Sequence, residues 1–197
     1  MKLPKIIGIA GTNGAGKDTL GELLAELQQY KFVSVSDILR EELTKQGIPH
    51  EREHMRALST KWASEHGPAV LSVKTIEAYI EEEKREGYKG LVIGSIRRVA
   101  EAKAVHEEGG VVIWVDADRQ TRYERLQKNS RGRSEDRVSY EEWVSQEDAE
   151  MHPIGDDPNA LNMAALRDVV DIKVDNNFAS QKEYRDFLIE QFDLTTN

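Results

Sequence analysis

The sequence has no cysteine among its 197 residues, which excludes disulfides and thiolate metal sites. It also lacks any apolar run that approaches the length of a membrane span. The apolar segment 6–10 is too short for a secretory signal and continues directly into a glycine-rich stretch. These absences favour a cytoplasmic protein.

Positive charge is scarce as well, with 27 Lys and Arg against 36 Asp and Glu and a formal net charge of -9. Because nucleic acids and membrane surfaces are polyanionic, we expect neither as a partner. A small phosphate ligand needs only local positive charge. The length suits a single domain over residues 1–197 with a sizeable core, and the sequence carries no signal for its oligomeric state.

A glycine-rich stretch, Gly11–Thr19, follows an apolar run at Lys5–Ala10 and precedes a segment with apolar residues at helical spacing. Two of its glycines bracket four residues and Lys17 follows, as the pattern G-x-x-x-x-G-K requires. In such a loop, successive N–H groups converge on phosphate oxygens, and the helix N-terminus adds partial positive charge. The stretch therefore predicts a triphosphate site, in which Lys17 reaches the terminal phosphates.

The pattern departs from expectation at its last position, where Asp18 stands in place of Ser or Thr and Thr19 follows one residue later. Two interpretations of Asp18 remain open. It is either an acid favoured in the first turn of a helix or a water-mediated contact to Mg²⁺.

Five short apolar strands alternate with helices, which predicts an α/β protein with a parallel sheet covered on both faces. We expect ligands beyond the carboxyl ends of the strands, where polar residues gather. The strands are expected at 5–10, 32–36, 91–94, 111–115 and 169–174. The helices are expected at 16–29, at 38–86 with breaks at 47–49 and 67–68, and at 98–108, 119–128, 140–149 and 182–192.

The chain resembles the P-loop nucleotide kinases. Gly11–Thr19 is similar to the adenylate-kinase-like loop G-x-x-G-A-G-K-G-T, and Ser34–Arg40 to the Ser-Thr-Gly-Asp-Leu-Leu-Arg run of that group. Gly94–Arg97 is a loose counterpart of Asp-Gly-Phe-Pro-Arg, and Ile172–Asn177 resembles the last strand of dephospho-coenzyme A kinases. Segment 90–116 resembles phage-type deoxynucleoside monophosphate kinases, which share Gly-Lys-Asp-Thr, and an archaeal group of nucleotide-kinase-like proteins matches most of the chain.

The resemblance implies a three-layer α/β/α sandwich of the P-loop NTPase type. It implies transfer of the γ-phosphoryl of ATP, with Mg²⁺, to a small phosphorylated acceptor, with a nucleoside or deoxynucleoside monophosphate as first choice. The alternatives are a dephospho-coenzyme A kinase and a regulatory or ATP-hydrolysing module. Asp18 and Thr19 would contact Mg²⁺, directly or through water. The implied ATP-binding residues are Gly11, Asn13, Gly14, Ala15, Gly16, Lys17, Asp18, Thr19, Arg125 and Asn177.

The acceptor would bind at a helical insertion at about 38–86. Arg40 within the insertion and Arg97 after the third strand would clamp the phosphate of the acceptor. Asp37 would cap a helix, hold a water on Mg²⁺, or accept a proton from an acceptor hydroxyl. A short lid at about 129–138, carrying Arg131 and Arg133, would close over ATP and exclude water. The implied catalytic residues are Lys17, Asp37, Arg97 and Arg133.

The third strand departs from the family pattern, because Gly94 or Ser95 stands where related kinases carry an acid that supports magnesium. Either phosphates and waters hold Mg²⁺, or Asp18 or Asp116 replaces that acid. A separate run, His50–His54, fits the zinc pattern H-E-x-x-H. Its charged neighbours and the lack of a third ligand favour a solvated helix within the insertion instead.

Overall fold

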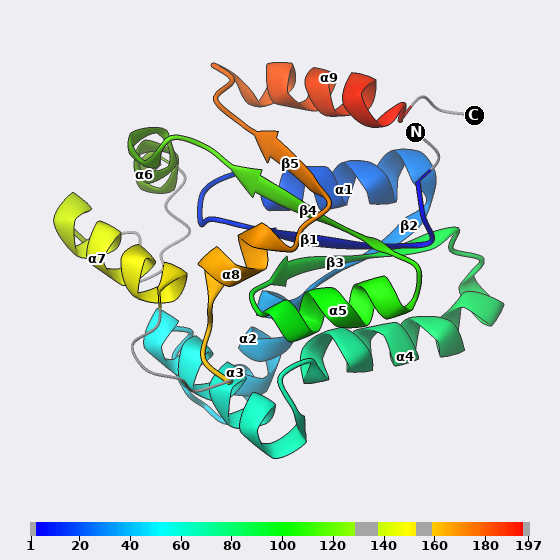
Figure 1. Ribbon diagram of the computed structural model, residues 1–197, viewed down its shortest axis with the longest axis horizontal. Helices are drawn as coiled ribbons and strands as arrows, with labels where there is room; N and C mark the ends of the chain where they lie inside the picture. The colour runs from blue at the N-terminus through cyan, green and yellow to red at the C-terminus, as the bar shows by residue number, and fades with distance from the viewer. Residues whose placement is uncertain (1–2, 129–137, 153–158, 195–197) are drawn as a thin grey trace.

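A parallel sheet of five strands forms the centre of the molecule, a computed structural model that describes residues 3–128, 138–152 and 159–194 (Figure 1). Neighbouring strands pair in the order β2-β3-β1-β4-β5. This arrangement confirms the predicted α/β class and the five-stranded parallel sheet. The strands are β1 (Ile6–Gly11), β2 (Tyr30–Ser34), β3 (Gly90–Ile96), β4 (Val111–Asp116) and β5 (Ile172–Asp175).

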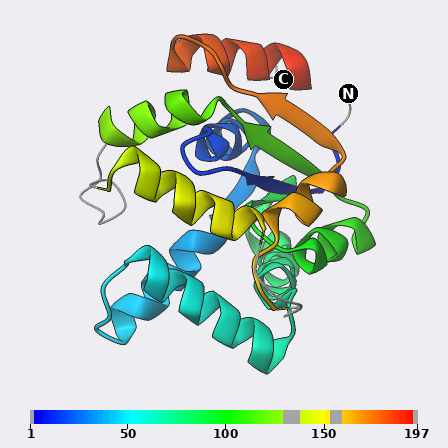
Figure 2. The same ribbon diagram turned by 60° about the vertical axis from the view of Figure 1, so that its left-hand side comes forward.

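Helices cover both faces of the sheet, so the chain is the three-layer sandwich expected of a P-loop kinase-like fold (Figures 1 and 2). One face carries α1 (Lys17–Gln28) and α9 (Gln181–Phe192), which pack against each other. The opposite face carries α2 (Val35–Lys45), α4 (Val70–Glu86), α5 (Val99–Glu107) and α8 (Met163–Asp168). Three further helices lie outside these layers: α3 (Arg52–His66), α6 (Arg119–Lys128) and α7 (Tyr140–Met151).

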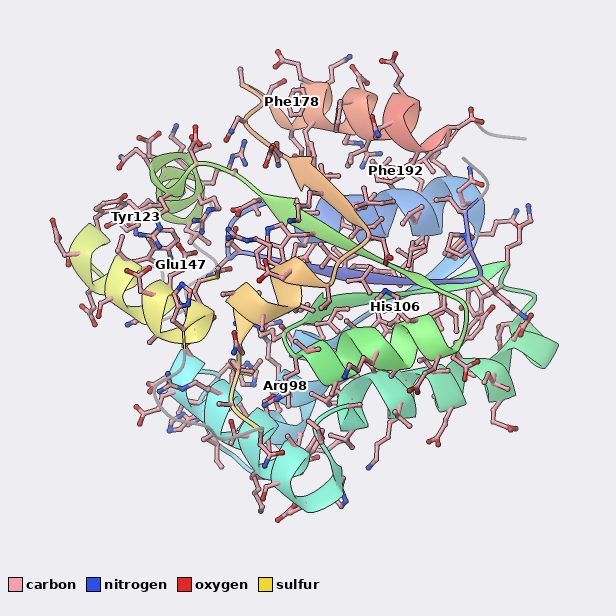
Figure 3. The ribbon with its side chains drawn as sticks, in the orientation of Figure 1. Arg98, His106, Tyr123, Glu147, Phe178 and Phe192 are labelled. Atoms are coloured by element: carbon pink, nitrogen blue, oxygen red, sulfur yellow. The ribbon has the colours of Figure 1, made fainter. Side chains whose placement is uncertain are left out.

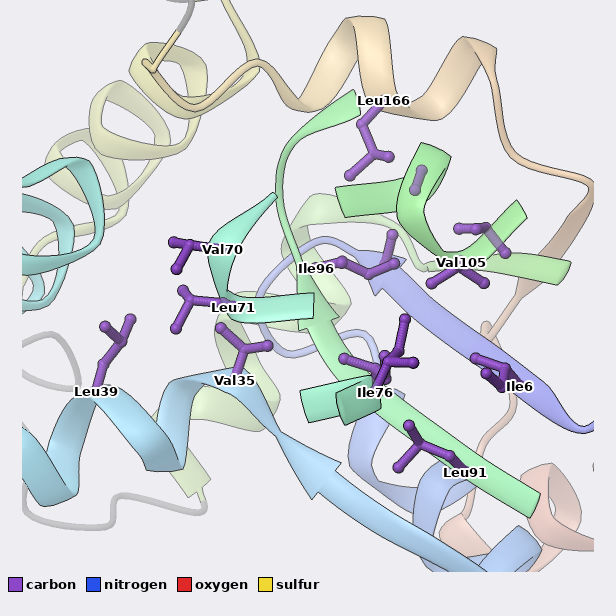
Figure 4. Packing of buried hydrophobic residues seen from close by; sticks show 14 of the residues in the cluster. Ile6, Val35, Leu39, Val70, Leu71, Ile76, Leu91, Ile96, Val105 and Leu166 are labelled. Carbon is purple, nitrogen blue, oxygen red and sulfur yellow. The ribbon is translucent and has the colours of Figure 1, made fainter. Parts of the chain in front are cut away.

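The strands divide their side chains between two cores, as alternation along a β-strand requires. In β1, Ile7 and Ile9 face α1 and α9, and Ile6 faces the opposite layer, which Figure 4 shows from close by. All six residues of β1 are buried. A strand that is buried on both faces reads as a continuous apolar run, which is why the sequence revealed this one.

The central strand β1 lies between β3 and β4, so the glycine-rich loop leaves the middle of the sheet. Beside it, the pairing of β1 with β3 shifts: Ile9 faces Gly94, but Ala10 faces Ile96. The extra residue, Ser95, is buried and has a φ of 65°, which is uncommon for a residue with a side chain. An irregular strand end therefore lies next to the loop.

Two predicted boundaries were wrong. The second strand ends at Ser34 and α2 begins at Val35, so Asp37 lies in the first turn of α2 and is not its N-cap. Val35 continues the apolar alternation of the strand, but it also lies four residues before Leu39, which is helical spacing. Both side chains are buried in the same core, and this packing favours the helix. The last strand begins at Ile172, and the short helix α8 before it was not predicted.

Within the described residues 3–128, 138–152 and 159–194, no helix has the length and apolar character needed to cross a membrane.

Candidate functional site

The glycine-rich loop depends on two glycines for close approach to its neighbours. A side chain at Gly11 would place its Cβ 1.9 Å from the carbonyl oxygen of Val115. Gly16 has a φ of 94° and is the N-cap of α1, and a Cβ there would lie 2.6 Å from the Asn176 amide nitrogen. No side chain caps α1 at this end. Its first N–H groups therefore remain available to an anion.

A carboxylate supports the loop from the next strand. The Thr12 hydroxyl donates to Asp116 Oδ1 at 2.6 Å, and the Ala117 N–H donates to the same oxygen at 2.9 Å. The Trp114 ring nitrogen lies 3.3 Å from Asp116 Oδ2. Asp116 thus contacts the loop through Oδ1 and its own strand through Oδ2. Because both oxygens already have partners, Asp116 is not suited to replace the missing acid of β3 as a magnesium ligand.

A buried ion pair between Arg122 and Glu147 supports the loop, and its acid, Glu147, is labelled in Figure 3. Arg122 is only 3% exposed and meets both carboxylate oxygens of Glu147 on α7. It also donates to the carbonyl oxygens of Ala117 at 2.8 Å and Asn13 at 3.3 Å, and its guanidinium lies 5.1 Å from the Trp143 ring centroid. The guanidinium of Arg122 therefore uses its hydrogen-bond donors to hold the loop in place.

Lys17 lies across the loop and donates from Nζ to the carbonyl oxygen of Thr12 at 2.6 Å. Burial, together with the positive charge of Arg97, lowers its pKa from 10.5 to about 8. The adjacent Asp18 opposes this shift only in part. A bound phosphate would favour the charged form of the ammonium group and would restore the pKa.

The segment after β5 closes one end of the site. Arg125 on α6 donates to the carbonyl oxygen of Phe178 at 3.1 Å and approaches Asn176 Oδ1 at 3.4 Å. The amide of Asn176 donates to the carbonyl oxygen of Ala15 at 2.8 Å. The side chain of Asn177 accepts instead from the Asp118 N–H. Asn176 is thus the asparagine that contacts the loop, whereas the resemblance had selected its neighbour Asn177.

A single cleft of about 920 Å³ runs from the loop to the insertion formed by α2 and α3. It gathers most residues predicted for a site, although they come from four strand ends. Gly11 and Ala15 contact the supporting strands, and Arg133 with the rest of 129–137 lies outside the described residues. The predicted residues that line the cleft are Asn13, Gly14, Gly16, Lys17, Asp18, Thr19, Asp37, Arg40, Arg97 and Arg125.

In the same cleft, two arginines share one buried carboxylate. Glu150 on α7 is 8% exposed and accepts from Arg52 Nε at 2.7 Å through one oxygen and from Arg97 through the other. Burial alone would raise the pKa of Glu150, but Arg97 and then Arg52 lower it to about 2. The sequence offered no signal for Glu150, because it lies 53 residues from Arg97 along the chain.

The turn that carries Arg97 is held by a second acid. Buried Glu101 accepts from the N–H groups of Arg97 and Arg98 at 2.8 and 2.9 Å, and burial raises its pKa. Arg98, labelled in Figure 3, donates to the Ser59 hydroxyl and to the Asn159 carbonyl oxygen, both at 2.9 Å. These bonds tie α3 to the end of β3 and thereby place the insertion against the cleft.

At the rim of the cleft, Arg40 pairs with Asp37 at 2.6 Å, and the Asp37 side chain is 74% exposed. The run His50–His54, which fits the zinc pattern, does not form one helical face, because α3 begins at Arg52 and His50 precedes it. His50 bonds to Thr44, and His54 bonds to the Pro49 carbonyl oxygen. Among the residues that the structure describes, no group of three His, Asp or Glu is arranged to hold a metal.

Comparison with known proteins agrees with this geometry. A family model described as an AAA domain matches residues 7–152. A UPF0200 protein of Thermococcus sibiricus is 31% identical over 148 residues, covering 72% of this chain and 74% of that protein. A UPF0200 protein of Methanococcus maripaludis strain C7 is 26% identical over 186 residues, covering 93% of this chain and 92% of that protein.

Solved structures share the fold at lower identity. Shikimate kinase from Bacteroides thetaiotaomicron aligns with a TM-score of 0.58 and 13% identity over 94% of each chain. Shikimate kinase from Acinetobacter baumannii in complex with shikimate aligns with a TM-score of 0.53 and 17% identity, covering 96% of this chain and 93% of that chain. At these low sequence identities, the likeness shows that the chain shares the P-loop kinase-like fold and nothing more.

Proposed function

The chain belongs to the family whose model is described as an AAA domain, which matches residues 7–152, and it is related to the UPF0200 proteins. We propose that it is a phosphotransferase. It transfers the γ-phosphoryl of ATP, with Mg²⁺, to a small phosphorylated acceptor, most favourably a nucleoside or deoxynucleoside monophosphate. The observation that carries this proposal is the cleft itself. The glycine-rich loop lines it, and so do Arg97 and Arg52, whose guanidiniums share the carboxylate of Glu150.

The donor side supports the proposal through its backbone. The uncapped start of α1, the positive-φ glycines and Lys17 together provide a cradle for the phosphates of ATP. Asp18 and Thr19 line the cleft at the first turn of α1, where they fit an ion carried by the phosphates. When bound, Mg²⁺ neutralises charge that develops on the transferring phosphoryl group.

The acceptor side supports an anionic substrate. Guanidinium groups match phosphate oxygens in a planar, bidentate fashion, and Arg40, Arg52 and Arg97 all line the cleft. Arg98 and Glu101 hold Arg97 and the insertion in register. A substrate clamped here has its phosphate directed toward Lys17, whose charge is coupled to that of Arg97. Phosphoryl transfer depends mainly on such positioning and charge stabilisation.

A phosphate acceptor also needs no general base, because its oxygen is already ionised. A hydroxyl acceptor such as dephospho-coenzyme A would need one, and Asp37, which lines the cleft, would serve in that role. Its ion pair with Arg40 and its exposed position favour an electrostatic role. The lid at about 129–138 with Arg133 stays a prediction, since residues 129–137 lie outside the described part of the chain.

The test is an acceptor panel with Mg-ATP, comprising each nucleoside and deoxynucleoside monophosphate and dephospho-coenzyme A. We expect ATP consumption to depend on a monophosphate and to yield the diphosphate. Hydrolysis without an acceptor, or binding without turnover, would contradict the proposal and favour the regulatory or ATP-hydrolysing alternative.

Asp37→Asn separates the two acceptor classes. It should change the rate with a monophosphate by no more than about threefold, because that reaction needs no base. A loss of about 10²-fold or more would assign a proton-accepting role to Asp37 and favour a hydroxyl acceptor. Glu41→Gln, which also removes a negative charge from α2, is the matched control.

A further inference from the structure

The carboxylate of Glu150 makes the contacts that a phosphate monoester would make at this place. One oxygen accepts from Arg52 at the start of α3, and the other accepts from Arg97 at the end of β3. Both arginines line the cleft, and so does Glu150. The place where two guanidiniums hold an anion, in the same cleft as a phosphate loop, is where an acceptor phosphate would have to bind.

Charge and burial make this position exclusive. Arg52 and Arg97 carry two positive charges and Glu150 carries one negative charge, so a dianionic phosphate in place of the carboxylate balances the two guanidiniums better. A phosphate cannot simply bind beside Glu150, because two anions sharing one buried site repel each other strongly. An acceptor phosphate that uses Arg52 and Arg97 must therefore take the place of Glu150.

The position of Glu150 in the chain permits such a movement. It is the penultimate residue of α7, which ends at Met151, so its displacement involves only the last turn of the helix. With a pKa of about 2, it remains ionised at neutral pH. A competing anion, and not protonation, is therefore what releases the two arginines.

We propose that Glu150 occupies the acceptor-phosphate position when no acceptor is bound and that the phosphate of the acceptor displaces it by anion exchange. This inference rests on the proposed function and narrows its substrate class to phosphate monoesters that can compete with a buried carboxylate. Glu150 is then a specificity-determining residue: neutral sugars and alcohols cannot displace it, and the site stays closed to them.

The test measures binding of inorganic phosphate to the whole protein by isothermal titration calorimetry, without ATP. Glu150→Gln should bind phosphate about tenfold more tightly than the wild type, because the competing charge is gone. Asp148→Asn is the matched control, since it removes the same charge from the same helix but pairs with Arg119 outside the cleft. It should bind within about twofold of the wild type.

Equal or weaker binding by Glu150→Gln would overturn the proposal. The gain in phosphate affinity must also disappear in the double variant Glu150→Gln with Arg97→Ala. A gain that persists there would place the phosphate elsewhere and would equally overturn the proposal.

A second measurement needs no variant that could fail to fold. In wild-type protein, the NMR signal of the Arg52 Nε–H should shift at saturating phosphate, because its partner changes, and an unchanged signal would refute displacement.

The two proposals fail in different ways, because phosphate binding requires no turnover. If the acceptor panel yields no phosphotransfer but Glu150→Gln still binds phosphate more tightly, the proposed function falls and the anion exchange stands. If a monophosphate is phosphorylated but Glu150→Gln gains no affinity, the exchange falls and the proposed function stands.

Discussion

The proposed donor half and the proposed acceptor half of the cleft are built by different means. The proposed donor half is the backbone of one continuous glycine-rich stretch, and contacts from Asp116 and Arg122 hold it. In the acceptor half, Arg52, Arg97 and Glu150 come from three elements that are far apart in the sequence. Their contacts are side-chain ion pairs.

This difference predicts different behaviour. Backbone N–H groups at a helix terminus keep their direction as long as the helix exists, so the donor half is rigid and should fail abruptly when a supporting residue is lost. Ion pairs between side chains can exchange partners, so the acceptor half should fail by degrees and in a manner specific to the acceptor. Variants in each half can break or sharpen this contrast.

The largest effect should follow Lys17→Ala in the donor half. We expect ATP-dependent phosphotransfer to fall by about 10³-fold, because a buried positive charge beside the transferring phosphoryl group is lost. The melting temperature should stay equal or rise, since burial lowers the pKa of this ammonium group and so opposes its charged form. Steady-state kinetics and thermal melts, with Lys45→Ala as an exposed control on α2, test this. A loss of less than tenfold would contradict the role of Lys17.

Glu147→Ala should show that the donor half depends on its buried support. It leaves Arg122 buried without its bidentate carboxylate, which costs about 3–5 kcal/mol in the free energy of unfolding. For a chain of this size, the melting temperature should fall by roughly 10 °C in scanning calorimetry. Asp186→Ala, which breaks the exposed pair with Lys182, should leave it unchanged. Similar shifts for both variants would mean that the Arg122–Glu147 pair does not support the loop.

Arg97→Ala should affect the acceptor half selectively. We expect the KM for the acceptor to rise by about 10- to 100-fold, as for loss of a charge-assisted hydrogen bond, and the KM for ATP to change by no more than about threefold. Initial rates at varied concentrations of both substrates measure this, with Arg185→Ala on α9 as a surface control. The opposite pattern would assign Arg97 to the donor.

The smallest effect is the pH dependence of ATP binding. In the empty protein Lys17 is charged below about 8 and neutral above it, whereas its ordinary pKa is 10.5. Because phosphate binds the charged form, ATP affinity should fall about tenfold per pH unit above that value, and binding should take up a proton. Between the two pKa values the unfolded chain binds more protons than the folded one, so the contribution of Lys17 to stability rises with pH. Calorimetry from pH 7 to 10 tests this, and a slope retained by Lys17→Ala would refute it.

Several features were predictable because they depend on neighbours in the sequence. Gly11–Thr19 is one continuous stretch that joins the end of β1 to the start of α1. The apolar runs of β1 and β4 are buried on both faces of the sheet. The boundary between β2 and α2 was not predictable, because Val35 satisfies both periodicities. The choice between Asn176 and Asn177 was equally open, since one residue changes the direction of the side chain.

The sequence by itself determined the class of fold and the position of the donor loop, because strand periodicity and a glycine-lysine turn are local properties. Only the tertiary structure decided which charges meet. It set Asp116 and Arg122 beneath the loop, and it set Glu150 between Arg52 and Arg97. The physical reason is that an ion pair requires two groups within about 4 Å, and for residues far apart in the chain only packing can bring them that close.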